Sequence, residues 1–210
     1  SIRDSQEVLD DYQSHDSNEV TVVDVGGNAI IPGLIDSHTH IVWGGDRSRE
    51  VRWKQQGKTY LDIANMGGGI VSTVNSTKSL TEKELFIIAK KRMLESLRNG
   101  TTHIETKSGY GLDTDNEIKL LNVAKQLSED NETPSIDSTW LGAHAIPSKH
   151  TLESYTEEII SKQLPLVAET QLARSADVFC EPGWFGIDES EEILMAAKSY
   201  GMNLRMHIDE

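Results

Sequence analysis

Short apolar runs alternate with longer helical patterns along most of this chain. Five runs have the length and composition of buried strands, each with a polar end: 34–36, 102–105, 136–141, 178–180 and 204–206. Helical periodicity fills the intervals, and three helices begin at a Thr or Asp followed three residues later by Glu: Thr81 and Glu84, Thr114 and Glu117, Asp188 and Glu191. This alternation is typical of a parallel sheet with crossover helices.

The composition permits a packed core and argues against several classes of protein. Hydrophobic residues make up 37% of the 210 residues, which excludes wholesale disorder. The 20 Lys and Arg against 34 Asp and Glu give a net charge of −14, which argues against nucleic-acid binding. One cysteine cannot form an internal disulfide, and no run of 18 apolar residues occurs, so we expect a cytoplasmic protein that does not span a membrane.

The strongest chemical signal follows the first strand, at Asp36-Ser37-His38-Thr39-His40. Alternate residues of a strand point the same way, so His38 and His40 can present two imidazoles to one ion. Neutral imidazole suits zinc and iron(II). The carboxyl ends of parallel strands meet at one edge, and His207 follows the last strand run. Glu210 comes three residues later and is placed to carry protons beside an activated water.

Each of these residues also has a simpler interpretation. The His-x-His pattern by itself fits two polar residues at a strand end. His207 taken alone fits a core histidine satisfied by a hydrogen bond. Glu210 fits a surface carboxylate, which is the usual state of glutamate in so acidic a chain.

Several segments, in order along the chain, resemble the imidazolonepropionase family of metal-dependent amidohydrolases. The Pro-Gly-x-x-Asp-x-His-Thr-His element marks only the superfamily, whereas Lys-Ser-Gly-Tyr-Gly-Leu-Asp and Leu-Gly-Ala-His-Ala indicate this one member. The similarity runs from about residue 20 to residue 210. The segments that carry it are 32–40, 45–47, 67–70, 105–113, 141–145 and 177–181.

The resemblance implies an α/β fold, an incomplete (β/α)₈ TIM-type barrel with part of a small β-sandwich. Residues 1–31 would form the N-terminal part of the sandwich, and residues 32–210 the first five strands of the barrel with their helices. A complete barrel of this type needs about 250 residues. We therefore expect that the chain is the N-terminal half of a longer enzyme, or a truncated sequence of one. It would then lack the aspartate that completes the family's metal site.

The same resemblance implies hydrolysis of the cyclic amide of 4-imidazolone-5-propanoate to N-formimidoyl-L-glutamate, in histidine degradation. It implies one Zn or Fe ion per chain, held by His38, His40 and His207, with His207 and Glu210 as catalytic residues. The substrate's carboxylate would bind Arg47, since arginine can hold a carboxylate with two parallel hydrogen bonds. Tyr110, His144 and Glu210 match further substrate-binding positions. The resemblance leaves a homodimer of the full-length enzyme open.

Two alternatives to this activity remain. One is another mononuclear amidohydrolase or a cyclic deaminase, against which Arg47, Tyr110 and His144 count, because a purine or pyrimidine has no propanoate. The other is a non-catalytic fragment that binds a metal or a second chain.

The fourth strand run carries no lysine that could bridge two metals, which favours one metal.

Overall fold

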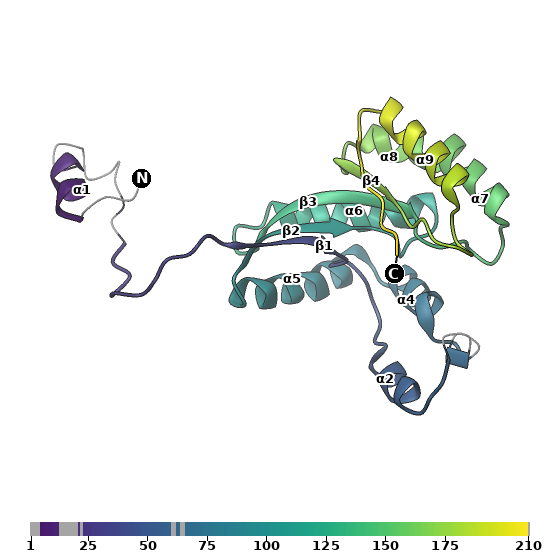
Figure 1. Ribbon diagram of the computed structural model, residues 1–210, viewed down its shortest axis with the longest axis horizontal. Helices are drawn as coiled ribbons and strands as arrows, with labels where there is room; N and C mark the ends of the chain where they lie inside the picture. Colours follow the sequence, from purple (N-terminus) through teal and green to yellow (C-terminus); the bar gives the residue numbers. More distant parts are fainter. Residues whose placement is uncertain (1–4, 13–20, 22, 60–61, 64–65, 210) are drawn as a thin grey trace. The chain divides into compact units, whose positions relative to one another are not determined.

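The computed structural model describes residues 5–12, 21, 23–59, 62–63 and 66–209 (Figure 1). The chain divides into two compact units, Ser1–Pro32 and Gly33–Glu210. In the first unit, the helix α1 (Ser5–Tyr12) is the only regular element among the residues described there. The assignment of residues 1–31 to a β-sandwich stays a prediction.

The second unit is built on a parallel sheet of five strands, which lie side by side in chain order (Figure 1). This confirms the predicted fold class, a parallel α/β sheet. Crossover helices between parallel neighbours are the standard solution for such a sheet. The strands are β1 (Leu34–Thr39), β2 (Thr101–Lys107), β3 (Ser135–Ala143), β4 (Ser175–Val178) and β5 (Asn203–Leu204).

Two strands differ from their predicted positions. β4 ends at Val178, where the apolar run predicts its start, and β5 starts one residue and ends two residues earlier than expected. The pattern misleads because Ser175 and Asp177 are polar yet almost completely buried inside β4. Pairing continues past the last strands through a single parallel bridge between Phe179 and His207.

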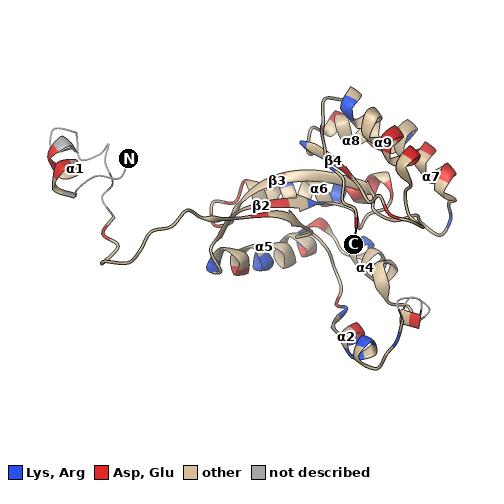
Figure 2. Cartoon of the chain, in the orientation of Figure 1, with Lys and Arg blue, Asp and Glu red and all other residues tan. Residues whose placement is uncertain are grey.

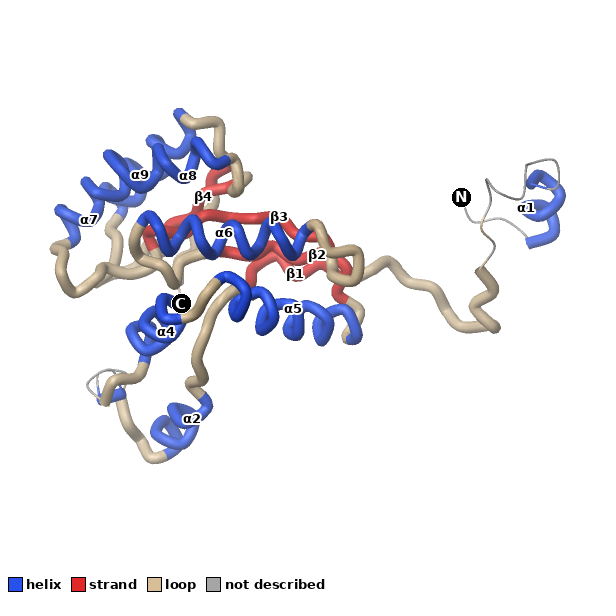
Figure 3. Tube along the Cα trace, turned by 180° about the vertical axis from the view of Figure 1, so that it is seen from behind, coloured by secondary structure: helices blue, strands red, loops and turns tan. Residues whose placement is uncertain are grey.

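The crossover helices α5, α6 and α9 pack against the sheet, whereas α2 and α4 project away from it (Figures 1 and 3). α5 packs on β2, α6 packs on β3 and on α5, and α9 packs on β4 and β5. Trp140, Tyr155 and Phe185 are among the fully buried side chains of the resulting apolar core. The helices are α2 (Ser48–Gln55), α4 (Gly69–Ser79), α5 (Glu82–Arg98), α6 (Thr114–Ser128), α7 (Leu152–Glu158), the π-helix η1 (Ile159–Gln163), α8 (Leu164–Thr170) and α9 (Ile187–Ser199).

One of the three predicted capping patterns is confirmed, at Thr81, where the side chain accepts from the Glu84 N–H and the Glu84 carboxylate accepts in return. The other two are wrong, and the reason is the same in both. Each helix starts earlier than the pattern suggests, so a residue upstream of the predicted cap takes that position. The observed caps are Asp113 for α6 and Gly186 for α9.

Several of the acidic residues lie on the last helices. Figure 2 marks Asp and Glu positions along α7 and α9. Within the described part of the chain, no helix has both the length and the apolar character needed to cross a membrane.

Candidate active site

Four histidines from three strand ends lie together at the carboxyl edge of the sheet. His38 and His40 come from the end of β1, His144 follows β3, and His207 follows β5. The ring centre of His38 lies 5.2 Å from that of His207 and 6.1 Å from that of His40. The rings of His40 and His144 stack with centres 4.9 Å apart. Residues separated by up to 169 positions thus form one cluster, as expected where parallel strands end together.

Hydrogen bonds fix which nitrogen of three rings carries the proton. His40 Nδ1 lies 2.8 Å from the Ser108 carbonyl oxygen, and His144 Nδ1 lies 2.8 Å from that of Gly109. His207 Nδ1 lies 3.2 Å from Oδ1 of Asp177. Carbonyl and carboxylate oxygens only accept, so each Nδ1 donates and each Nε2 keeps its lone pair.

Burial favours the neutral form of His38, His40 and His144. It lowers the pKa of His40 well below its ordinary value and that of His144 to about 4. Burial, followed by the nearby Lys107 ammonium, also lowers the pKa of His38. Neutral imidazole with a free lone pair is the form that binds a metal ion.

The chemistry of these donors fits the metal set predicted from the sequence, His38, His40 and His207. Two of the three donate Nδ1–H to an oxygen, which is the usual outer-shell support of a metal-bound histidine. In residues 5–12, 21, 23–59, 62–63 and 66–209, however, no three His, Cys, Asp or Glu side chains are arranged so that they could hold an ion. The metal set therefore stays a prediction. Glu210 lies outside the described residues.

A cavity of about 590 Å³ adjoins the histidine cluster. Three predicted substrate-binding residues, Arg47, Tyr110 and His144, line it together. The Tyr110 ring centre lies 4.8 Å from that of His40 and 5.2 Å from that of His144. The rest of the lining is largely apolar and aromatic, with Ile70, Phe179 and Trp184 alongside Lys54. Two cationic side chains, Arg47 and Lys54, and several rings around a cavity suit a small, flat anion.

Arg47 is held by a residue that sequence reasoning missed. Its Nε and Nη2 donate to the two carboxylate oxygens of Glu50, at 3.0 and 2.9 Å. Glu50 is 5% exposed, and its Oε1 also accepts from the Gly69 N–H at the start of α4. The hydrogen bond from Arg47 holds the pKa of Glu50 below its usual range. Glu50 therefore ties the guanidinium to the N-terminus of α4.

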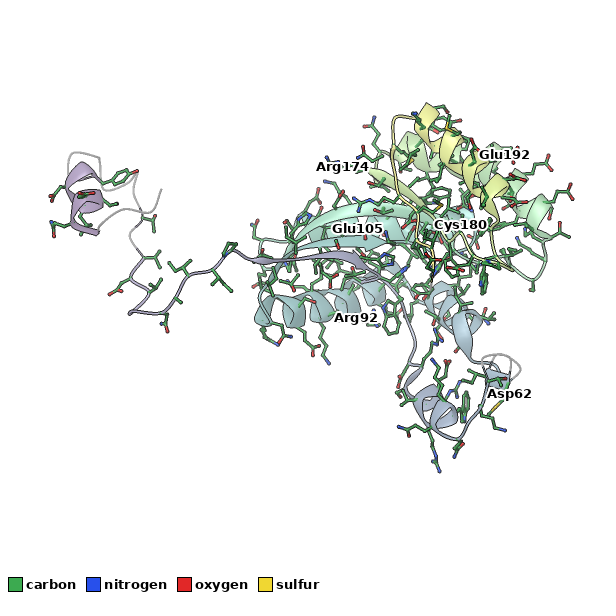
Figure 4. The ribbon with its side chains drawn as sticks, in the orientation of Figure 1. Asp62, Arg92, Glu105, Arg174, Cys180 and Glu192 are labelled. Atoms are coloured by element: carbon green, nitrogen blue, oxygen red, sulfur yellow. The ribbon has the colours of Figure 1, made fainter. Side chains whose placement is uncertain are left out.

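A buried ion cluster lies beneath the histidines and was also missed. Lys107 Nζ, at the end of β2, lies 2.8 Å from Glu105 Oε1 and 2.6 Å from Asp177 Oδ2. All three side chains are at most 3% exposed, and Figure 4 shows Glu105 within the strand layer. Although burial raises it, the hydrogen bonds from His207 and Lys107 hold the pKa of Asp177 below its usual value. The strand period places Glu105 and Lys107 on one side of β2, a signal that could have indicated them.

Curated relatives match the chain over most or all of its length, although no family profile matches it. It is 43% identical to the imidazolonepropionase of Clostridium tetani over 211 residues, covering 100% of this chain and 50% of that protein. It is 44% identical to the imidazolonepropionase of Shewanella sediminis over 186 residues, covering 88% of this chain and 45% of that protein. The chain thus spans about half the length of the curated relatives it matches.

A solved structure supports the fold. The 5-methylcytosine deaminase from Klebsiella pneumoniae, liganded with phosphonocytosine, matches with a TM-score of 0.59 and 17% identity, over 90% of this chain and 43% of that chain. At this identity the likeness concerns the fold alone. Together these findings confirm the resemblance to imidazolonepropionases that the motifs indicate.

Proposed function

We propose that this chain supplies the histidine cluster and the carboxylate-binding arginine of an imidazolonepropionase. The reaction is hydrolysis of the cyclic amide of 4-imidazolone-5-propanoate to N-formimidoyl-L-glutamate, in histidine degradation. The observation that carries the proposal is the shared cavity, in which Arg47 lies with Tyr110 and His144 beside the four histidines. The identity to the Clostridium tetani relative supports it.

The cavity residues divide into a charge-binding part and a ring-binding part. Arg47 binds the propanoate, because a guanidinium has five donors and can hold both Glu50 and a ligand carboxylate. His144 donates Nδ1–H to Gly109, so its Nε2 accepts from a ring N–H of the substrate. Tyr110 contacts the same ring through its phenol. Glu210 accepts a second ring N–H and carries protons to the departing nitrogen.

His38, His40 and His207 are the residues that would hold one Zn or Fe ion, through Nε2. A divalent ion bound there supplies Lewis-acid activation of water. Burial lowers the pKa of His38 and of His40, while Ser108 orients His40 and Asp177 orients His207. We further propose a cytoplasmic location, in keeping with the single cysteine.

The deaminase alternative is separated from this proposal by the charge of the ligand. A neutral pyrimidine offers Arg47 no carboxylate, whereas an imidazole with a propanoate arm offers both a carboxylate and a flat ring. Binding of imidazole-4-propanoate and of cytosine to the zinc-loaded chain, measured by titration calorimetry, distinguishes the two. We expect binding of imidazole-4-propanoate only, and the reverse preference would favour a deaminase.

Turnover is tested on the chain alone and on the chain mixed with a separately purified C-terminal half of the Clostridium tetani relative. The loss of the imidazolone ring's ultraviolet absorbance reports hydrolysis. Activity in either sample that is lost with Arg47→Ala supports the proposal. Binding of imidazole-4-propanoate with no turnover in either sample would favour the non-catalytic alternative.

A further inference from the structure

Glu117 is a fully buried carboxylate that the predicted site does not include. The Thr114 and Glu117 pattern predicts that it caps α6, but its side chain turns instead to the loop that follows β2. Oε2 accepts from the Gly109 N–H at 2.8 Å, and Oε1 accepts from the N–H groups of Gly111 and Leu112 at 2.7 and 2.8 Å. Ser108 donates a side-chain hydrogen bond to the same carboxylate.

The opposite side of this loop holds the two stacked histidines. The carbonyl of Ser108 accepts from His40 Nδ1, and the next carbonyl, of Gly109, accepts from His144 Nδ1. Tyr110 follows directly, and its ring lies beside both stacked histidines at centre distances of 4.8 and 5.2 Å. One loop of five residues therefore sets the orientation of three rings at the cavity.

The loop needs an internal support because its backbone is unusual. Gly109 has φ +97°, and a Cβ there would lie 2.8 Å from His144 Nδ1, so the close approach of that ring requires glycine. Leu112 has φ 52°, a conformation that side chains other than glycine rarely adopt. Such backbone persists only where surrounding contacts enforce it, and here those contacts converge on Glu117.

We propose that Glu117 is the positioning residue of this site. Its carboxylate organises residues 108–112, whose carbonyls orient His40 and His144 and which place Tyr110 in the lining of the cavity beside His144. Glu117 acts on the rings through this loop. The consequence for ligand binding rests on the proposed function, whereas the arrangement of the rings does not.

Glu117→Gln is the sharpest test because it keeps the shape of the side chain and removes one acceptor. Its single oxygen can still serve two N–H groups, but its NH₂ then faces the Gly109 N–H, donor against donor. The matched control is Val123→Ala, which shortens a fully buried side chain on the same helix and leaves the hydrogen bonds to the loop in place. Both variants are examined with the full chain by NMR.

In the unaltered chain, the amides of Gly109, Gly111 and Leu112 should be protected from hydrogen exchange. In Glu117→Gln, exchange at Gly109 should be at least about tenfold faster than in Val123→Ala, because the local opening has become easier. The nuclear Overhauser contacts from Tyr110 to His40 and His144 should disappear. Retained protection and contacts in Glu117→Gln would overturn the proposal, as would unprotected amides in the unaltered chain.

If Glu117→Gln does not fold, Gly111→Ala decides the question. Its Cβ would lie 2.5 Å from the backbone nitrogen of Glu117 and 2.8 Å from its Oε1, which forces the loop away from the first turn of α6 and from an intact carboxylate. The same ring contacts should then be lost, and their retention would refute the proposal. Imidazole-4-propanoate should bind at least about tenfold more weakly to Gly111→Ala than to the unaltered chain, because misplaced ligand contacts commonly cost that much affinity. Failure of the unaltered chain to bind it would contradict the proposed function, while the ring contacts would still decide the role of Glu117.

Discussion

The imidazole rings of His40 and His144 stack with their planes 12° apart, although 103 residues separate them along the chain. Each donates Nδ1–H to one of two consecutive carbonyls, those of Ser108 and Gly109. Two buried rings so close together favour the neutral form of both, because a charge on either would be poorly solvated and would repel a charge on the other. This relationship links the site to the stability of the chain.

The first prediction concerns the pH dependence of stability in chelator-treated protein. The pKa of His144 is about 4 in the folded chain, against about 6.5 for an unfolded histidine. The unfolded chain binds more protons between these values, so the free energy of unfolding falls as the pH drops from about 6.5 to about 4. Below that window His144 adds no further loss. Its contribution is at most about 3 kcal/mol.

Urea denaturation of the unaltered chain and of His144→Asn at several pH values measures the contribution of His144 to the pH dependence of the free energy of unfolding. The variant should have a shallower slope across the window. An identical slope in both proteins would show that His144 titrates in the folded state as it does in the unfolded state.

The second prediction concerns Arg47 as the group that binds a carboxylate. Arg47→Lys keeps the positive charge but loses the planar fork, so imidazole-4-propanoate should bind more weakly by about 2–3 kcal/mol, or roughly 30- to 150-fold. Titration calorimetry measures the change. Arg49→Lys is the matched control, because Arg49 packs over Trp53 rather than lining the cavity. Equal effects of the two substitutions would remove Arg47 from the binding site.

The third prediction concerns Asp177, which supports His207 and pairs with Lys107. Asp177→Asn removes the negative charge behind the imidazole, and loss of such support typically weakens metal binding by about 10- to 100-fold. Zinc affinity at constant pH is the measurement. Asp137→Asn serves as the control, since Asp137 in β3 pairs with Arg205, which follows β5, and no hydrogen bond found in the described part of the chain joins Asp137 to His207. Unchanged zinc affinity in Asp177→Asn would argue that His207 is not a ligand.

The fourth prediction separates the observed cap of α6 from the one that the pattern indicates. Asp113 accepts from the Asn116 N–H at 2.9 Å and pairs with Lys78 at 2.6 Å. Asp113→Ala should therefore cost about 1–2 kcal/mol of unfolding free energy. Thr114→Val, which removes only the hydroxyl of the predicted cap, should be nearly neutral. Urea denaturation that ranks the two in the opposite order would restore Thr114 as the cap.

Much of the site follows from local sequence and one general rule of parallel sheets. The alternation of short apolar runs with helical periods predicts the β-α order, and the carboxyl ends of parallel strands must then share one edge. That rule predicts that His38, His40, His144 and His207 lie close together. The Gly-Asp-Arg and Ser-Gly-Tyr-Gly motifs likewise indicated Arg47 and Tyr110, which line the same cavity.

Only the tertiary structure determines which partners the buried charged residues around the histidine cluster have. A glutamate, lysine or aspartate is most often exposed, so neither composition nor period indicates that Lys107 and Asp177, 70 residues apart, form a buried pair. The partners of Glu117 could not be predicted from the sequence either. Its spacing from Thr114 fits a capping box, but in the folded chain four donors of the loop 108–112 bind its carboxylate instead. Local patterns determine where strands and helices form. The partners of a buried charge are the distant groups that the fold brings within hydrogen-bonding distance, because a buried charge without a partner is costly.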